Sequence, residues 1–100
     1  MNIIIKSVNF KADNKLKRFI REKVKKLFKH YDSIIRANVI LSKGESKNLE
    51  NKLCEIRLVV PGYDHYVKKS NEEYHKSVSQ SVDVLEEILR RNKTRLVSNR

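Results

Sequence analysis

The stretch from Asp13 to Tyr31 constrains the fold of this chain most strongly, because its apolar residues recur at helical spacing. They lie three and four positions apart and fill one arc of a helical wheel; these are Leu16, Phe19, Ile20, Val24, Leu27, Phe28 and Tyr31. Asp13 is a good N-cap, since its carboxylate can accept the free backbone N–H groups of the first turn. The pattern predicts an amphipathic helix with one buried face.

The opposite face of this helix is strongly basic. The stretch holds eight Lys or Arg residues against Asp13 and Glu22, a net charge of +6. Lys23 falls inside the apolar arc, and Lys26 falls at its edge. One interpretation is a lysine whose stem lies along the core while its ammonium reaches solvent. The other is a cation at the lip of a groove between this helix and its neighbour.

The remaining positive charge is concentrated at the end of the chain. The 100 residues carry a net charge of +11, yet residues 32–89 hold eight basic and ten acidic groups. The last eleven residues contain no acidic residue and five basic ones, Arg90, Arg91, Lys93, Arg95 and Arg100. Charge gathered in two segments is typical of a surface that binds an anionic partner such as nucleic acid.

The length predicts one domain over residues 1–100, with a basic C-terminal tail at about 90–100. A lone Cys54 excludes an internal disulfide and fits a reducing compartment. The longest apolar runs, such as residues 3–5, are too short for a signal peptide or a membrane span. We therefore expect a soluble cytoplasmic protein.

Four strands are predicted from β-branched residues and from the alternation of apolar and polar residues, at about residues 2–8, 34–42, 52–60 and 64–69. Residues 43–51 are polar and predict a loop, and Pro61-Gly62 predicts a tight turn. A second helix is expected to begin with Ser70-Asn71-Glu72-Glu73, which has the form of a capping box. Its apolar stripe is Tyr74, Val78, Val82, Leu85, Ile88, Leu89 and Leu96.

These elements predict an α+β fold of order β-α-β-β-β-α, a two-layer sandwich. The first two strands suit parallel pairing through a right-handed crossover, and the last three suit an antiparallel meander, which together make a four-stranded mixed sheet. Both helices must cover the same face, because neither has two apolar sides. In the second strand, we expect Ile35, Ala37, Val39 and Leu41 to face the core. The other expected core residues are Phe19, Leu27, Ile56, Leu58, Val82 and Leu85.

Catalytic and metal chemistry finds no support in the residue spacing. His30, His65 and His75 have no ligand spacing with one another or with Cys54, and two glycines make no phosphate loop. We expect no enzyme activity, no cofactor and no metal, with Cys54 acting as a small core hydrophobe. The neighbours of the turn, Tyr63 and Tyr66, fit either local packing or stacking on bases.

Five segments of the chain are informative together with the order of the elements. They are Leu16-Lys17-Arg18-Phe19-Ile20-Arg21-Glu22-Lys23-Val24-Lys25-Lys26-Leu27, His30-Tyr31-Asp32, Ile56-Arg57-Leu58-Val59-Val60-Pro61-Gly62, Tyr74 to Leu89 and Arg90 to Leu96. In this order they resemble the ribosome hibernation promoting factor family. The resemblance covers essentially the whole chain, and its specificity comes from the order and spacing of these segments.

The resemblance implies a factor that binds ribosomal RNA of the small ribosomal subunit in the messenger and transfer RNA channel. Such a factor inhibits translation and favours inactive ribosomes in stress or stationary phase. It implies no membrane partner and no small-molecule substrate, and we expect a monomer away from the ribosome. The chain resembles the short form, without the dimerising C-terminal domain of long forms.

The resemblance also implies which residues face ribosomal RNA: Lys23 and Lys26 on the first helix, and Arg91, Lys93 and Arg95 near the end of the second. We add Arg18, Lys25 and Arg90 as RNA-binding candidates on the same basic segments. The macrodipole of the second helix offers another explanation for Arg90 and Arg91. Val84 and Glu87 depart from the family pattern, which often has basic residues there, and Glu86 and Glu87 would repel phosphate along the middle of this helix.

Two other classes of protein fit parts of the pattern. A basic amphipathic helix suits a membrane surface, but a small domain needs Leu16, Phe19 and Leu27 for its core. A general double-stranded-RNA-binding domain places lysines at the start of its last helix, where this chain has Asn71-Glu72-Glu73. The sequence therefore favours a binding site made by the first helix and the end of the second.

Overall fold

The computed structural model describes residues 2–45 and 47–98, with side chains through residue 92. Its elements follow the predicted order β-α-β-β-β-α. They are β1 (Ile3–Ser7), α1 (Asn14–His30), β2 (Arg36–Lys43), β3 (Lys52–Val60), β4 (Tyr63–Asn71) and α2 (Tyr74–Ser98).

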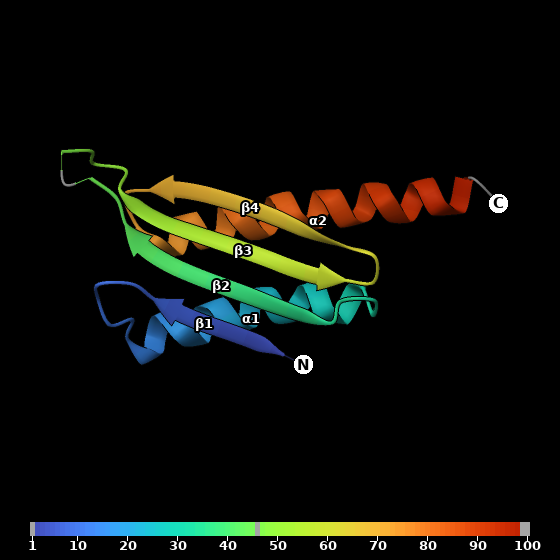
Figure 1. Cartoon of the computed structure of the whole chain (residues 1–100), viewed down its shortest axis with the longest axis horizontal. Coiled ribbons are helices and arrows are strands. Elements are labelled where there is room, and N and C mark those ends of the chain that lie inside the picture. Colours follow the sequence, from blue (N-terminus) through green and yellow to red (C-terminus); the bar gives the residue numbers. More distant parts are fainter. Residues whose placement is uncertain (1, 46, 99–100) are drawn as a thin grey trace.

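The four strands form one mixed sheet in the order β1-β2-β3-β4. β1 runs parallel to β2, while β2, β3 and β4 pair antiparallel. Figure 1 shows both helices on the same face of this sheet, running in the same direction, with α2 continuing past the end of the strands. The predicted two-layer architecture is confirmed.

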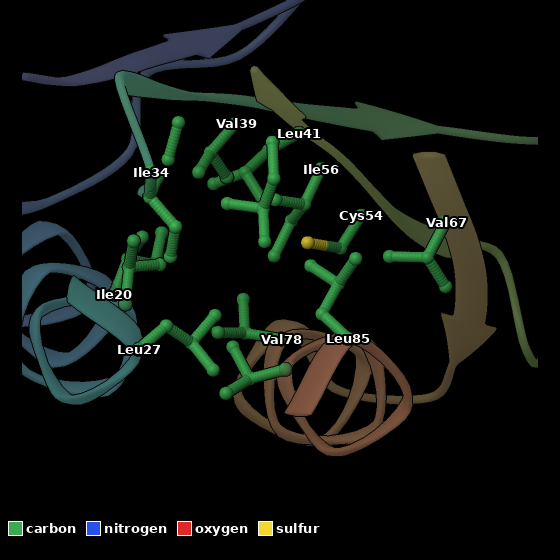
Figure 2. Packing of buried hydrophobic residues seen from close by; sticks show 14 of the residues in the cluster. Ile20, Leu27, Ile34, Val39, Leu41, Cys54, Ile56, Val67, Val78 and Leu85 are labelled. Atoms are coloured by element: carbon green, nitrogen blue, oxygen red, sulfur yellow. The ribbon is translucent and has the colours of Figure 1, made fainter. Parts of the chain in front are cut away.

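The core lies between the sheet and the two helices. Figure 2 shows strand residues such as Val39, Cys54 and Ile56 pointing toward Leu27 of α1 and Leu85 of α2. These five side chains are at most 1% exposed. Cys54 therefore acts as a core hydrophobe, as predicted.

Local signals at two boundaries are confirmed. The Asp13 carboxylate accepts a 2.8 Å hydrogen bond from the backbone N–H of Leu16 and caps α1. Pro61 and Gly62 form the two-residue connection between β3 and β4. Gly62 has φ +94°, a conformation that glycine adopts without steric cost. The turn therefore depends on the glycine at this position.

The prediction that Ile35 faces the core is wrong. Ile35 is 52% exposed, and Ile34 is buried in its place. The regular strand begins only at Arg36, and the backbone N–H of Ile34 still donates to the carbonyl of Tyr31. Ile34 thus enters the core from the turn after α1, before the alternation of β2 begins. Phe19 is only partly buried at the margin of the core.

The predicted capping box at Ser70 is also wrong. β4 extends to Asn71, and Ser70 pairs with Leu53 of β3. β3 is long enough to pair with Ser70 and Asn71, so these residues continue the strand. Such pairing depends on the neighbouring strand and is not visible in the local sequence. α2 begins at Tyr74, and the backbone N–H of Ser77 donates to the carbonyl of Glu73.

α2 carries two buried serines that the sequence pattern did not predict, and one of them joins the helix to the sheet. The Ser77 hydroxyl donates a 2.6 Å hydrogen bond to the backbone carbonyl of Lys52 in β3. The Ser81 hydroxyl donates to the carbonyl of Ser77 at 2.8 Å. Among the described residues, no buried side-chain nitrogen or oxygen lacks a hydrogen-bond partner. Two polar groups are therefore held in the core at little cost.

Candidate nucleic-acid interface

The outer surface of α1 carries a field of unpaired positive charge. The helix holds eight cations and a single carboxylate, that of Glu22. Its Lys and Arg residues make no ion pair with any residue that the structure describes. They are Lys15, Lys17, Arg18, Arg21, Lys23, Lys25, Lys26 and Lys29. A helix with this surface is suited to hold an anionic partner.

Lys23 lies at the border between the two helices. Its Nζ is 5.7 Å from the centroid of the Phe19 ring, and the residue is half-buried. The Phe19 ring in turn meets His75 of α2 edge-on, with centroids 4.7 Å apart. The two interpretations of Lys23 therefore coexist, because its stem covers apolar surface while its ammonium lies above an aromatic ring.

The other α1 candidates occupy two sides of the helix. Lys26 follows Lys23 by three residues, so helical spacing places it on the side of α1 that faces α2, and it is exposed. Arg18 and Lys25 are exposed and line a shallow depression on α1, together with Asn14, Arg21 and Glu22. Lys23 and Lys26 thus form the inner pair of cations, and Arg18 and Lys25 the outer pair.

The candidates on α2 lie near its C-terminal end and are partly neutralised. Arg91 donates from Nε to the Glu87 carboxylate at 3.0 Å, and Arg90 also contacts Glu87. Both arginines remain largely exposed. The side chains of Lys93 and Arg95 lie outside the described residues, although the backbone at both positions belongs to α2. Glu87 thus engages its own neighbours, which leaves less of its charge to repel phosphate.

The structure spreads the candidate residues along the helix layer instead of gathering them at one point. The helices run in the same direction (Figure 1). The Phe19–His75 contact places Lys23 beside the start of α2. Arg90 follows His75 by four helical turns, about 22 Å along the axis. A row of cations of this length suits an extended polyanion such as an RNA backbone.

A cleft at one end of the molecule was not predicted. We call it the end cleft. It has a volume of about 690 Å³ and is lined by His30, Tyr31, Asp32, Ser33, Val60, Pro61, Tyr63, His65, Leu89 and Asn92. These residues come from three separate stretches of the chain, 30–33, 60–65 and 89–92. The alternation of Tyr63 and His65 in one strand indicates a shared side, but no signal in the sequence brings Asn92 to them.

The described residues form neither a metal site nor a reactive thiol site. No three His, Cys, Asp or Glu side chains in residues 2–45 and 47–92 are grouped to hold a metal ion. Burial raises the pKa of the Cys54 thiol to about 12, partly offset by a hydrogen bond with Ser81. This thiol is therefore a poor nucleophile at neutral pH. Across the described part of the chain, no helix is long and apolar enough to cross a membrane.

The chain is similar to known proteins over most of its length. The model of the sigma 54 modulation protein / S30EA ribosomal protein family matches residues 3–97. The ribosome hibernation promotion factor of Deinococcus radiodurans is 28% identical over 93 residues, which cover 92% of this chain and 49% of that protein. The chain thus spans about half the length of this curated relative.

Two solved structures have the same fold. The N-terminal domain of Thermus thermophilus Protein Y superposes with a TM-score of 0.76 at 23% identity, covering 91% of this chain and 98% of that domain. A ribosomal subunit interface protein from Coxiella burnetii gives a TM-score of 0.82 at 18% identity, covering 94% and 99%. The family match over nearly the whole chain shows that it belongs to the sigma 54 modulation protein / S30EA ribosomal protein family, whose members are ribosome-associated proteins and not enzymes.

Proposed function

We propose that this protein is a ribosome hibernation factor that binds ribosomal RNA of the small subunit. It occupies the channel of messenger and transfer RNA, inhibits translation, and stabilises inactive ribosomes in the cytoplasm during stress or stationary phase. The observation that carries this proposal is the unpaired positive surface of α1, whose cations make no ion pair with any described residue. Family membership and the ribosomal names of its relatives support it.

Binding follows from the way the fold divides α1. Its apolar face is used in the core, where Leu16, Ile20, Val24 and Leu27 are buried, so the cations must face solvent. A sheet and a second helix behind α1 hold these cations on a rigid surface. Each phosphate that they neutralise releases a counterion from the RNA, so affinity is high at low salt and falls as salt rises.

The proposed contact surface contains all the RNA-binding candidates. Lys23 and Lys26 make the inner contacts between the helices, and Arg18 and Lys25 make the outer contacts on α1. Arg90, Arg91, Lys93 and Arg95 extend the positive row along the end of α2. A domain held on the RNA by this surface excludes messenger and transfer RNA by occupying their space. The protein acts by binding, as a monomer away from the ribosome, and needs no cofactor or small-molecule substrate.

The test compares two double variants of equal net charge. Lys23→Gln with Lys26→Gln removes the inner pair, and Lys43→Gln with Lys47→Gln removes two lysines at the end of β2 and in the β2–β3 loop, where the two central strands of the sheet meet. Co-sedimentation with purified small subunits is measured over a salt series, alongside inhibition of translation. Circular dichroism first establishes that both variants are folded.

The inner variant is expected to bind at least about tenfold more weakly. Its plot of log affinity against log salt concentration should be shallower by about two units of slope. The loop variant is expected to bind like the wild type. Equal binding by the two variants would show that the contact surface is elsewhere. Equal affinity of the wild type for an unrelated duplex RNA and for small subunits would favour a general RNA-binding domain.

A further inference from the structure

The end cleft lies beside the proposed phosphate contacts, which do not use it. One wall comes from the end of α1 and the loop after it, and the other from the β3–β4 turn, the start of β4 and α2. Its volume of about 690 Å³ lies in the range of small-molecule sites. The cleft is therefore large enough for a planar ring system.

The β4 wall presents an aromatic ring that is exposed yet held in place. Tyr63 is 58% exposed, although large aromatic side chains usually bury more of their surface. The His65 ring meets it edge-on, with centroids 5.0 Å apart. The Asn92 amide of α2 lies 3.4 Å from the Tyr63 hydroxyl and 3.5 Å from His65 Nε2. These contacts orient the ring before any ligand arrives.

The remaining lining suits the two surfaces of a nucleobase. Val60 and Leu89 are buried and provide an apolar floor. On the opposite wall, His30 and Tyr31 present two further rings, with centroids 6.5 Å apart. Proteins that read unpaired RNA stack bases on aromatic side chains and hydrogen-bond their edges with amide and hydroxyl groups. The end cleft contains both kinds of group.

The position of the cleft links it to the proposed phosphate contacts. His30 follows Lys23 and Lys26 at helical spacing, so this side of α1 leads directly from the inner cations to the cleft. On α2, the lining residues Leu89 and Asn92 flank Arg90 and Arg91 in the chain. An RNA backbone held by these cations would bring a base to the mouth of the cleft.

One acidic residue in the lining affects which base fits. The exposed Asp32 carboxylate would repel a phosphate group that entered the cleft. It would accept a hydrogen bond from the exocyclic amino group of adenine, cytosine or guanine. Uracil has no exocyclic amino group and offers a carboxylate only its single ring N3–H. The lining thus favours a base over a phosphate, and an amino-bearing base over uracil.

We propose that the end cleft binds one unpaired, amino-bearing base of the RNA whose backbone the helices hold. This inference rests on the proposed function and adds to it a contact that depends on stacking instead of charge. Stacking contributes affinity that is insensitive to salt, whereas phosphate contacts set the salt slope. The two kinds of contact can therefore be separated by experiment.

The first measurement compares Tyr63→Ala with Tyr66→Ala in binding to small subunits. Both tyrosines are exposed on β4, but Tyr66 projects from the opposite face of the sheet, where it lies against Arg57. Tyr63→Ala is expected to weaken binding about tenfold with an unchanged salt slope, and Tyr66→Ala less than twofold. Tyr63→Phe keeps the ring and is expected to retain most of the affinity.

Dimethyl sulfate footprinting of the subunit is expected to show one adenine or cytosine that the wild type and Tyr66→Ala protect and Tyr63→Ala exposes. Equal binding and equal protection by Tyr63→Ala and Tyr66→Ala would overturn the inference. The proposed function would still stand in that case, because wild-type binding to the subunit would be intact.

The second measurement does not need the ribosome. Ring signals of Tyr63, His65 and His30 are followed by NMR while a single-stranded adenine hexanucleotide is added, with an abasic hexanucleotide of equal charge as the control. The adenine hexanucleotide is expected to shift these signals, and the abasic hexanucleotide is expected to leave them unchanged. Shifts without subunit binding would support the cleft and contradict the proposed function, whereas identical responses to both oligonucleotides would overturn the cleft assignment.

Discussion

The ammonium of Lys23 lies over the ring of Phe19, 5.7 Å from its centroid. A candidate RNA-binding side chain is therefore held by a residue that packs between the two helices. The same ring meets His75 of α2. A cation held in this way loses less side-chain freedom when it binds a phosphate than a free lysine does. This relationship leads to the first prediction.

Lys23 and Phe19 are expected to stabilise each other. A double-mutant cycle with Lys23→Gln and Phe19→Leu should give a coupling energy of about 0.5–1 kcal/mol by urea unfolding. The control cycle uses Lys25→Gln in place of Lys23→Gln, and so removes an exposed cation of the outer pair. That cycle should give less than about 0.3 kcal/mol. Equal coupling in both cycles would show that the ring does not hold Lys23.

Glu87→Gln is expected to strengthen binding to small subunits several-fold. The substitution releases Arg91, whose Nε is 3.0 Å from the Glu87 carboxylate, and removes a negative charge beside the proposed RNA backbone. Glu73→Gln is a matched control, because Glu73 pairs with Lys76 at the other end of α2. It should change affinity less than twofold. A loss of affinity in Glu87→Gln would mean that Glu87 positions the arginines for binding.

Leu27→Ala and Leu85→Ala are each expected to lower the free energy of unfolding by about 2–5 kcal/mol. Both side chains are at most 1% exposed, one on each helix, and both pack against the sheet (Figure 2). Leu49→Ala makes the same chemical change at a residue that is 80% exposed, and should change stability by less than about 0.5 kcal/mol. A loss below about 1 kcal/mol at both buried sites would contradict this core.

Ser77→Ala is expected to destabilise the fold by about 1 kcal/mol, because it leaves the Lys52 carbonyl without the 2.6 Å hydrogen bond that joins α2 to β3. Ser81→Ala should have a smaller effect, since its hydroxyl bonds to the Ser77 carbonyl within the same helix. Chemical denaturation measures both variants. The reverse order of the two effects would argue against an interlayer role for Ser77.

Stability is expected to fall above pH 9 because of Cys54. Burial raises the pKa of this thiol from 9.0 to about 12 in the folded protein, so the fold favours the neutral form. The stability that the fold gains from keeping this thiol neutral is therefore complete below pH 9 and is lost as the pH rises toward 12. Between pH 8.5 and 10.5, the wild type should lose on the order of 1–2 kcal/mol more than Cys54→Ala. Parallel pH profiles of the two proteins would refute this assignment.

Much of the fold was predictable because its local signals are strong and independent of partners. The helical spacing from Leu16 to Tyr31, the cap at Asp13 and the turn at Pro61-Gly62 each act over a few residues, and all three are confirmed. The layer arrangement followed because each helix has a single apolar face. The basic character of α1 was equally visible, since it depends only on composition and helical period.

The sequence by itself determined the elements, their order and the side of α1 that must carry the charge. The tertiary structure alone decided that Ile34 is buried in place of Ile35, because the turn after α1 sets where β2 begins. It also brought Tyr63 and Asn92 together in the end cleft, through contacts between residues 29 positions apart in the chain. Such contacts arise from how α2 lies across the sheet, and no local propensity records them.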